Sequence, residues 1–260
     1  MKRFIIFLVP LSMAWAEVST VTVDGVKVDI YQPVKECQKN ILMLPGWSYS
    51  RTGWHQKTDL LKFAESNGYC LAFPEMGKAI YASRYFEETK RKVLKIPPQA
   101  WFQKNFFPEF ERKYAMFRNH QSNFIVGLST GARGAVLVAL SYQHKFDAIA
   151  ALSGDYNQVK MPADKLMTKV YGPFSIFKER WMSYDNPYYR AYQWRLPLYL
   201  GHGKPDKVIS VSQSVDYYKK LKELHPETDI RLHLADQGHN YEYWNSELGA
   251  IFDFFEEHKK

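Results

Sequence analysis

Ser129 is the centre of a pattern that could carry nucleophilic chemistry. Residues 127–131 read Gly-Leu-Ser-Thr-Gly and lie between the apolar run Asn123–Val126 and a helix-like stretch. Glycines two residues before and after a serine permit a sharp strand-to-helix turn that projects the hydroxyl above a sheet. The string alone is moderately specific, and a glycine-rich turn with an ordinary serine is the plain alternative. Its position between a strand and a helix favours a nucleophile.

A serine hydroxyl is a weak nucleophile and needs a base. In a sheet of this kind the base follows the last strand, in the chain order serine, acid, histidine. His239 lies just after the run Asp229–Leu234 and is the predicted base. His233, inside that run, is expected to be a packing residue. His202 follows another strand as a candidate pocket residue, and His55 lies near the expected oxyanion loop.

The base needs a carboxylate that orients its ring. Asp206 follows the strand-like run Pro197–Gly201 and falls in the expected loop, so it is the predicted acid. Two rivals remain open. Asp155 follows the preceding strand, a location that some lipases use, whereas Asp236 lies only three residues before the histidine.

Two backbone N–H groups should bind the oxyanion that develops during ester cleavage. One is expected from Thr130, directly after the nucleophile, and the other from Trp47 in the loop Leu44–Ser48. A Pro-Gly turn with a buried tryptophan is the plain alternative for that loop.

Other chemistries lack their motifs. No His or Cys cluster has metal-ligand spacing, and the chain has no G-x-G-x-x-G and no complete phosphate loop. We therefore expect neither a metal nor a cofactor. The net charge of +8 includes one basic run, Lys90–Lys92 with Lys95 nearby. That run is expected to be a solvated face, so nucleic acid is not an expected partner.

The elements that must position these residues alternate along the chain. An Asp-Gly pair between alternating β-formers predicts a hairpin over residues 19–30. Short apolar runs predict strands that are buried on both faces, at 40–44, 69–73, 123–126, 148–153, 197–201 and 229–234. Helices are expected at 58–67, 100–118, 130–142, 211–224 and 243–258. The predicted fold is α/β, with a mostly parallel sheet covered by helices on both faces.

Two connections are unusually long, Pro74–Pro98 and Gly154–Leu196. Such connections are often functional, and we expect both to wall the site, the second as a lid-like insertion over residues 154–196. Aromatic residues make up 16% of the chain. The aromatic candidates for substrate binding, besides Trp47, are Tyr49, Trp54, Tyr81, Trp181 and Tyr184. Together they hint at an aryl or sugar-linked acyl group.

The N-terminus has the layout of a secretory signal peptide. A basic head, Met1–Arg3, is followed by the apolar run Phe4–Met13 and the small-residue site Ala14-Trp15-Ala16. We expect cleavage after residue 16, a single domain over 17–260, and a secreted or periplasmic protein without a membrane span. Two cysteines, Cys37 and Cys70, in an oxidising compartment favour one disulfide.

Taken together, the sequence resembles the α/β-hydrolase superfamily and, within it, the esterase D group. That group includes S-formylglutathione hydrolases, feruloyl and acetylxylan esterases and mycolyltransferases. The resemblance runs from about residue 41 to the C-terminus. It is carried by Leu44-Pro-Gly-Trp, Phe107-Pro-Glu-Phe, Gly127-Leu-Ser-Thr-Gly-Ala-Arg-Gly-Ala, Leu152-Ser-Gly and Gly238-His-Asn-Tyr-Glu-Tyr-Trp.

The resemblance implies a triad of Ser129, Asp206 and His239, in agreement with the positional argument. It also implies that Cys37 and Cys70 lie near the N-terminal edge of the sheet, away from the catalytic loops. The chain departs from the group after the serine, where Thr-Gly-Ala replaces the usual Met-Gly-Gly. The exported N-terminus argues against formaldehyde detoxification, so the substrate is not inherited.

We therefore expect a serine hydrolase that cleaves small-molecule or glycan-linked carboxylic esters through an acyl-enzyme. An acyltransferase with the same triad is the nearest alternative. A peptidase would normally carry a further large domain. A non-catalytic binding module on a hydrolase fold is the alternative from another class. The sequence leaves the acyl group, the alcohol and the oligomeric state open.

Overall fold

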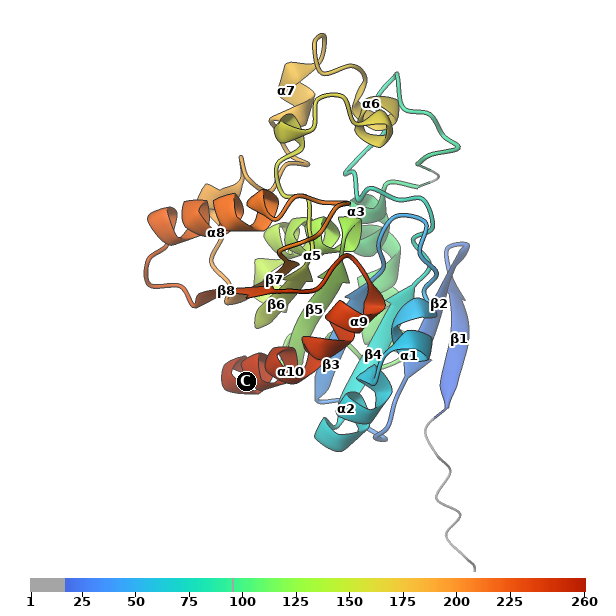
Figure 1. Ribbon diagram of the computed structural model, residues 1–260. Coiled ribbons are helices and arrows are strands. Elements are labelled where there is room, and N and C mark those ends of the chain that lie inside the picture. Colours follow the sequence, from blue (N-terminus) through green and yellow to red (C-terminus); the bar gives the residue numbers. More distant parts are fainter. Residues whose placement is uncertain (1–16, 95) are drawn as a thin grey trace, which may run out of the picture.

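Eight strands form one mixed sheet in the order β1-β2-β4-β3-β5-β6-β7-β8 (Figure 1). The computed structural model describes residues 17–94 and 96–260, so the expected signal segment 1–16 lies outside the described residues. The strands are β1 (Val18–Val23), β2 (Val26–Tyr31), β3 (Lys39–Leu44), β4 (Tyr69–Pro74), β5 (Ser122–Leu128), β6 (Ala148–Leu152), β7 (Leu198–Gly203) and β8 (Ile230–Ala235). From β4 to β8 all neighbours pair in parallel, whereas β1, β2 and β4 pair antiparallel.

Helices cover both faces of this sheet. They are α1 (Gly53–Lys57), α2 (Leu60–Asn67), α3 (Pro98–Trp101), α4 (Phe107–Lys113), α5 (Thr130–Ser141), α6 (Lys165–Tyr171), α7 (Lys178–Trp181), α8 (Ser212–Leu224), α9 (Tyr241–Ser246) and α10 (Leu248–His258). A π-helical turn, η1 (Phe102–Phe106), joins α3 to α4. Single 3₁₀ turns are η2 (Gln143–Lys145), η3 (Gln158–Lys160) and η4 (Ala191–Gln193).

Alternation along the central strands divides the core into two layers. Leu42 and Leu44 of β3 pack on the side of α4, α5 and α8, while Ile41 and Met43 pack on the side of α1, α2, α9 and α10. Both sets are fully buried, as a parallel strand with helices on each face requires. The α/β fold with its N-terminal hairpin is therefore confirmed.

Two predicted helices are divided in the structure. The expected helix 100–118 runs from α3 through η1 to the end of α4 at Lys113, after which Ala115 and Phe117 adopt φ angles of 53° and 61°. Residues with positive φ cannot continue a right-handed helix. The expected helix 243–258 is α9 followed by α10, with Glu247 between them.

The Cys37–Cys70 disulfide is present, with the two Cα atoms 5.8 Å apart. It ties the segment before β3 to the beginning of β4. The disulfide therefore lies at the amino ends of these two strands. The loops that carry the candidate site residues leave from the opposite, carboxyl ends of the parallel strands. No helix in the described part of the chain is long and apolar enough to cross a membrane.

The two long connections fold together beyond the carboxyl ends of the strands. We call residues 75–97 and 154–196 the cap. Within it, the Lys90 N–H donates to the Lys169 carbonyl and the Thr89 hydroxyl to the Val170 carbonyl, both at 2.8 Å. A separate apolar cluster that includes Ile80, Leu94 and Trp181 fills its interior. Figure 1 shows α6, α7 and the 82–94 chain together above the sheet.

Candidate active site

Ser129 occupies a strained turn between β5 and α5. Its backbone has φ 56° and ψ −127°, which a non-glycine residue rarely adopts. The turn depends on its glycines, because a Cβ at Gly127 would lie 2.1 Å from the Gly131 carbonyl oxygen. A Cβ at Gly131 would lie 2.4 Å from the Leu44 carbonyl oxygen. The G-x-S-x-G pattern thus has the geometry of a nucleophile elbow, with the serine side chain at the carboxyl end of the sheet.

Asp206 and His239 are brought together from two loops. Asp206 follows β7 and His239 follows β8, and His239 Nδ1 lies 2.6 Å from Asp206 Oδ2. Both side chains are almost completely buried. The His239 ring also packs edge-on against Trp244, with centroids 5.2 Å apart. The aspartate and the tryptophan fix the ring so that its Nε2 atom faces away from the acid.

A second histidine stands behind the acid. His202, at the end of β7, is fully buried, and its Nε2 lies 3.3 Å from Asp206 Oδ2. The other carboxylate oxygen accepts the N–H groups of Val208 and Ile209. Burial alone would raise the pKa of Asp206, but the bonds from His202 and His239 outweigh it and hold that pKa well below its usual value. The acid is therefore ionised, and His202 is not the pocket residue that we expected.

The two expected oxyanion donors flank the serine. A Cβ at Gly46 would lie 3.1 Å from Ser129 Cβ, so the loop that carries Trp47 passes beside Ser129. Among the hydrogen bonds of the described residues, none uses the backbone N–H of Trp47 or of Thr130. Two N–H groups without internal acceptors next to the serine are available for a substrate oxygen.

Tyr81 supports this loop from the cap. Its hydroxyl donates to the Pro45 carbonyl at 2.8 Å, and its ring occupies the space above Gly134 of α5. The side chain is fully buried, and its backbone has a φ of 54°. Tyr81 was expected to bind substrate, but its burial and its bond to Pro45 make it a support for the oxyanion loop. A sequence offers no signal for such a long-range contact.

The structure places a hollow next to the candidate base. It has a volume of about 350 Å³, and its lining includes Ser48, Tyr49, His239, Tyr241 and Trp244. No hydrogen bond joins the Ser129 hydroxyl to His239 among the described residues. Catalytic hydrogen bonds are often long before substrate binds and tighten in the complex.

The remaining aromatic candidates differ in position. Tyr49 lines the hollow beside His239. Trp54 and Trp181 are at most 1% exposed and belong to packed clusters, so they do not line a pocket as expected. Tyr184 is 47% exposed on the cap, and its ring contacts Arg190.

The two rival acids have other partners. Asp155 pairs with Arg133 at 2.8 Å, and both side chains are buried. Burial outweighs the attraction of Arg133 and raises the pKa of Asp155 to about 6. Asp236 is exposed and pairs with Lys204 at 2.9 Å. Of these three carboxylates, Asp206 is the one that hydrogen-bonds to His239.

Two other histidines have local partners. His233 was expected to be a packing residue, but 56% of its side chain is exposed and its Nδ1 contacts Glu247 at 2.8 Å. Strand β8 lies at the edge of the sheet, where its side chains are less covered than those of the central strands. His55 lies 3.2 Å from Asp29 and takes no part in the triad geometry.

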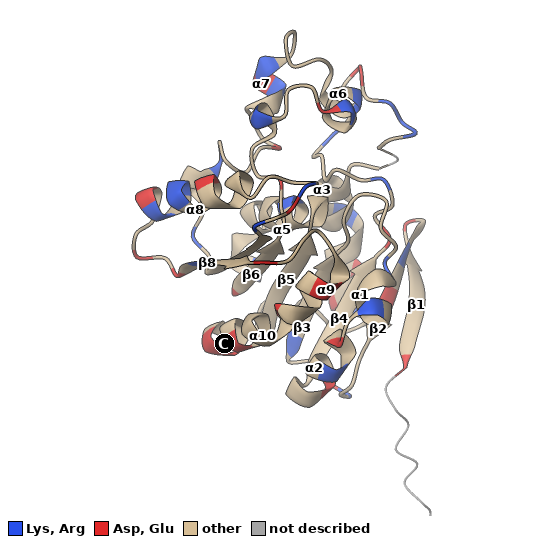
Figure 2. Ribbon diagram, in the orientation of Figure 1, with Lys and Arg blue, Asp and Glu red and all other residues tan. Residues whose placement is uncertain are grey.

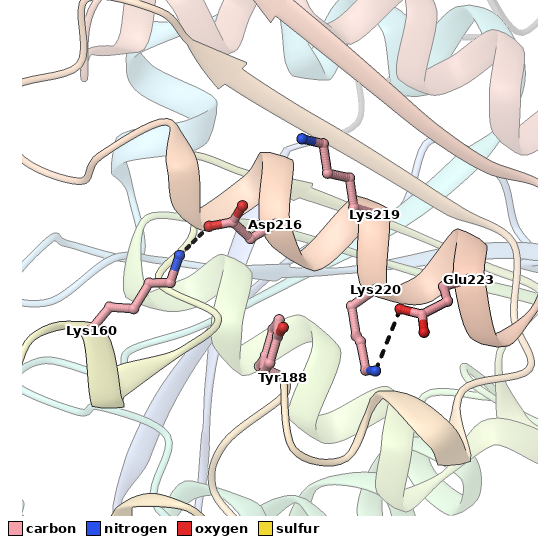
Figure 3. A pocket seen from close by; sticks show the side chains of 6 residues that line it. All are labelled: Lys160, Tyr188, Asp216, Lys219, Lys220 and Glu223. Atoms are coloured by element: carbon pink, nitrogen blue, oxygen red, sulfur yellow. Dashed lines mark hydrogen bonds and ion pairs between the residues drawn. The ribbon is translucent and has the colours of Figure 1, made fainter.

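Two further clusters of charged side chains consist of ion pairs. A hollow of about 320 Å³ lies beside α8. Among its lining side chains, Lys160 pairs with Asp216, and Lys220 lies 3.5 Å from Glu223 (Figure 3). Asp229, Glu257 and His258 lie close enough to share a cation. Arg231, however, already pairs with both carboxylates, at 2.7 and 2.5 Å, which accounts for this cluster as an ion-pair network.

The parallel sheet and the strained serine turn at its carboxyl end define an α/β-hydrolase. A model of the putative esterase family matches residues 110–255, more than half of the chain, and the chain therefore belongs to that family. Membership makes it a carboxylic-ester hydrolase. A search of curated protein sequences finds no match.

Solved structures agree on the fold. MPT51 of Mycobacterium tuberculosis has a TM-score of 0.76 at 11% identity, over 94% of this chain and 100% of that one. An S-formylglutathione hydrolase from Agrobacterium tumefaciens has a TM-score of 0.73 at 15% identity, over 94% and 95%. FphF, a fluorophosphonate-binding serine hydrolase of Staphylococcus aureus, has a TM-score of 0.65 at 18% identity, over 88% and 91%.

Proposed function

We propose that the protein is an exported esterase that works through Ser129, His239 and Asp206. The main support for this proposal is the hydrogen bond between His239 and the buried, ionised Asp206. Both residues lie at the carboxyl ends of the strands, where the strained Ser129 turn also lies. The three groups follow three different strands, in the chain order that this fold uses.

The proposed reaction has two halves. His239 Nε2 removes the Ser129 proton as Oγ attacks the ester carbonyl carbon, and Asp206 stabilises the imidazolium that forms. The N–H groups of Trp47 and Thr130 bind the oxyanion. His239 then donates its proton to the departing alkoxide. In the second half His239 deprotonates a water, which attacks the acyl carbon of the acyl-enzyme. The bond to Ser129 Oγ then breaks, His239 returns the proton to that oxygen, and the carboxylic acid is released.

Export is part of the proposal. The N-terminal pattern of residues 1–16 is that of a signal peptide, and the Cys37–Cys70 disulfide is typical of an oxidising compartment. Both features favour a secreted or periplasmic protein. The substrate is proposed to be a small-molecule or glycan-linked ester.

The test is hydrolysis of p-nitrophenyl acetate and butyrate by the chain beginning at Glu17, beside Ser129→Ala. We expect turnover by the parent and a loss of at least about a thousandfold in the variant. Equal turnover by both folded proteins would refute the role of Ser129. Transfer of the acyl group to an added alcohol, with little free acid, would instead favour the acyltransferase.

A further inference from the structure

All of the excess positive charge of residues 17–260 lies on the cap. It holds 13 Lys and Arg against 7 Asp and Glu, while the rest of residues 17–260 holds 20 of each. The rest of the domain therefore has no net charge, and the cap is strongly basic. Figure 2 shows blue segments around α6, α7 and the 84–92 chain.

The imbalance is larger at the surface. Two of the seven acids, Asp155 and Asp185, are buried, and among the described cap residues only Glu87 and Glu179 are exposed acids. Ten cations of the cap are exposed: Lys78, Arg84, Lys90, Arg91, Lys92, Lys160, Lys165, Lys169, Lys178 and Arg195. Such a surface attracts an anionic partner.

Apolar side chains are also exposed on the second segment of the cap. Of the eight large hydrophobic residues that are exposed in the described chain, five belong to residues 154–196: Ile176, Met182, Tyr184, Tyr189 and Tyr192. Ile176 is 70% exposed in the turn before α7, and Met182 follows the end of that helix. Lys178 lies between them, and Lys165 and Lys169 stand on the neighbouring α6.

A soluble polyanion would use the cations but not the apolar turn. An anionic bilayer uses both, because lysines attract the lipid phosphates while apolar side chains enter the headgroup region. We propose that the cap docks on an anionic lipid surface through Ile176 and Met182, flanked by Lys165, Lys169 and Lys178. Resting on the proposed function, the inference further assigns the substrate to esters presented at that surface.

Two neighbouring hollows lie between the candidate base and the first segment of the cap. The hollow beside His239 shares Ser48, Tyr49 and Ser50 with a larger hollow of about 850 Å³. The larger one reaches the cap, where Lys78 and Lys92 contribute to its lining. The lining of the larger hollow also includes Asp24 and Glu75, and Glu75 pairs with Arg51. In the proposed complex, the anionic headgroup of an ester would lie beside Lys78 and Lys92, with the ester carbonyl toward His239.

The test is co-sedimentation with phosphatidylcholine vesicles, with and without phosphatidylglycerol. The chain starts at Glu17, which leaves out the apolar residues 4–13 and keeps every described strand and helix, and carries Ser129→Ala so that no lipid is cleaved. We expect binding only when phosphatidylglycerol is present. Replacing Lys165, Lys169 and Lys178 by Gln should weaken that binding about a hundredfold, roughly a factor of five per lysine.

A matched triple variant controls for charge alone. Lys35, Lys62 and Lys104 are exposed outside the cap, and their replacement by Gln should leave vesicle binding unchanged. Ile176→Ser should weaken binding severalfold. Equal losses in the two triple variants, or equal binding to neutral vesicles, would overturn the proposal. Dextran sulfate bound as tightly as vesicles, with no effect of Ile176→Ser, would overturn it in favour of a polymeric anion.

The two proposals fail separately. In an otherwise unaltered chain, the Lys165, Lys169 and Lys178 variant should hydrolyse soluble p-nitrophenyl butyrate as the parent does. Vesicle binding without any hydrolysis would refute the triad and leave the docking surface intact. Hydrolysis without vesicle binding would refute only the docking surface.

Discussion

Asp206 differs from the other carboxylates near the site in the number of donors that it meets. Two histidines and two backbone N–H groups surround its oxygens, whereas Asp155 has one oxygen on Arg133 and a second that is buried without a partner. The first environment favours a permanent anion and the second penalises one. Asp206 should therefore matter for catalysis, and Asp155 for the pH dependence of stability.

Asp206→Asn should lower kcat for p-nitrophenyl butyrate by about 10⁴, because an amide favours the wrong tautomer of the histidine. Asp236→Asn is the matched control, since that side chain is exposed and should leave kcat unchanged. The rate of p-nitrophenolate release, followed by stopped-flow or steady-state absorbance, gives kcat for both variants. A large loss in Asp236→Asn alone would show that the acid is misassigned.

The pH dependence of stability should reveal Asp155. Its pKa in the folded protein is about 6, above the ordinary 3.8, so the native state holds the proton more tightly than the unfolded state does. The contribution of Asp155 to the unfolding free energy therefore falls as pH rises from about 4 to about 6, and is constant above. Urea unfolding of the parent and Asp155→Asn should show their difference changing only in that window. A difference independent of pH would contradict the raised pKa.

At the scale of elements, the turn between β5 and α5 lies in close contact with the loop after β3. The Leu44 and Pro45 carbonyls lie against Gly131, and Tyr81 holds Pro45 from the other side. Ser129 and the proposed oxyanion donors are thus positioned by one packed contact.

Gly131→Ala should destabilise the fold by about 1–3 kcal/mol, since a Cβ there meets backbone atoms that have no room to move. Activity should fall about a hundredfold through displacement of the oxyanion loop. Gly249→Ala is the matched control, because a Cβ at that helical position meets nothing within 4 Å. Thermal melts and p-nitrophenyl butyrate assays compare the two. A fully active, stable Gly131→Ala would contradict this packing.

The disulfide should act on stability and not on catalysis. Replacing Cys37 and Cys70 together by Ala should cost about 4 kcal/mol in the loop-entropy account for a separation of 33 residues. The activity of the folded protein should be retained, because the bond lies at the opposite end of the strands. The urea midpoint measures the loss of stability, and kcat at low denaturant measures the retained activity. A loss of kcat in the folded variant would show coupling to the site.

The sequence predicts local patterns well and long-range contacts poorly. Apolar runs and glycine spacing locate the strands and the serine turn, because both depend on neighbouring residues. The roles of Tyr81 and His202 depend on partners that other elements supply, at Pro45 and Asp206. The pairing of the two cap segments is of the same kind. The burial of Trp54 and Trp181 likewise follows from packing that composition does not reveal.

For the molecule as a whole, the chain divides into a neutral catalytic body and a basic cap, preceded by a segment with signal-peptide character. Expression of the full chain in a bacterium should yield a periplasmic or secreted protein that begins at Glu17 and has no free thiol. Intact mass and thiol titration measure both properties. A cytoplasmic protein that retains residues 1–16 would contradict export.

The central claim is that Ser129 is the activated nucleophile, and covalent labelling tests it most directly. The chain beginning at Glu17 is treated with a fluorophosphonate, and the modified peptide is located by mass spectrometry. We expect one label, on Ser129. The labelling reaction should be much slower in His239→Ala and absent in Ser129→Ala. A folded, disulfide-bonded protein that takes no label, or takes it on another residue, would contradict the account.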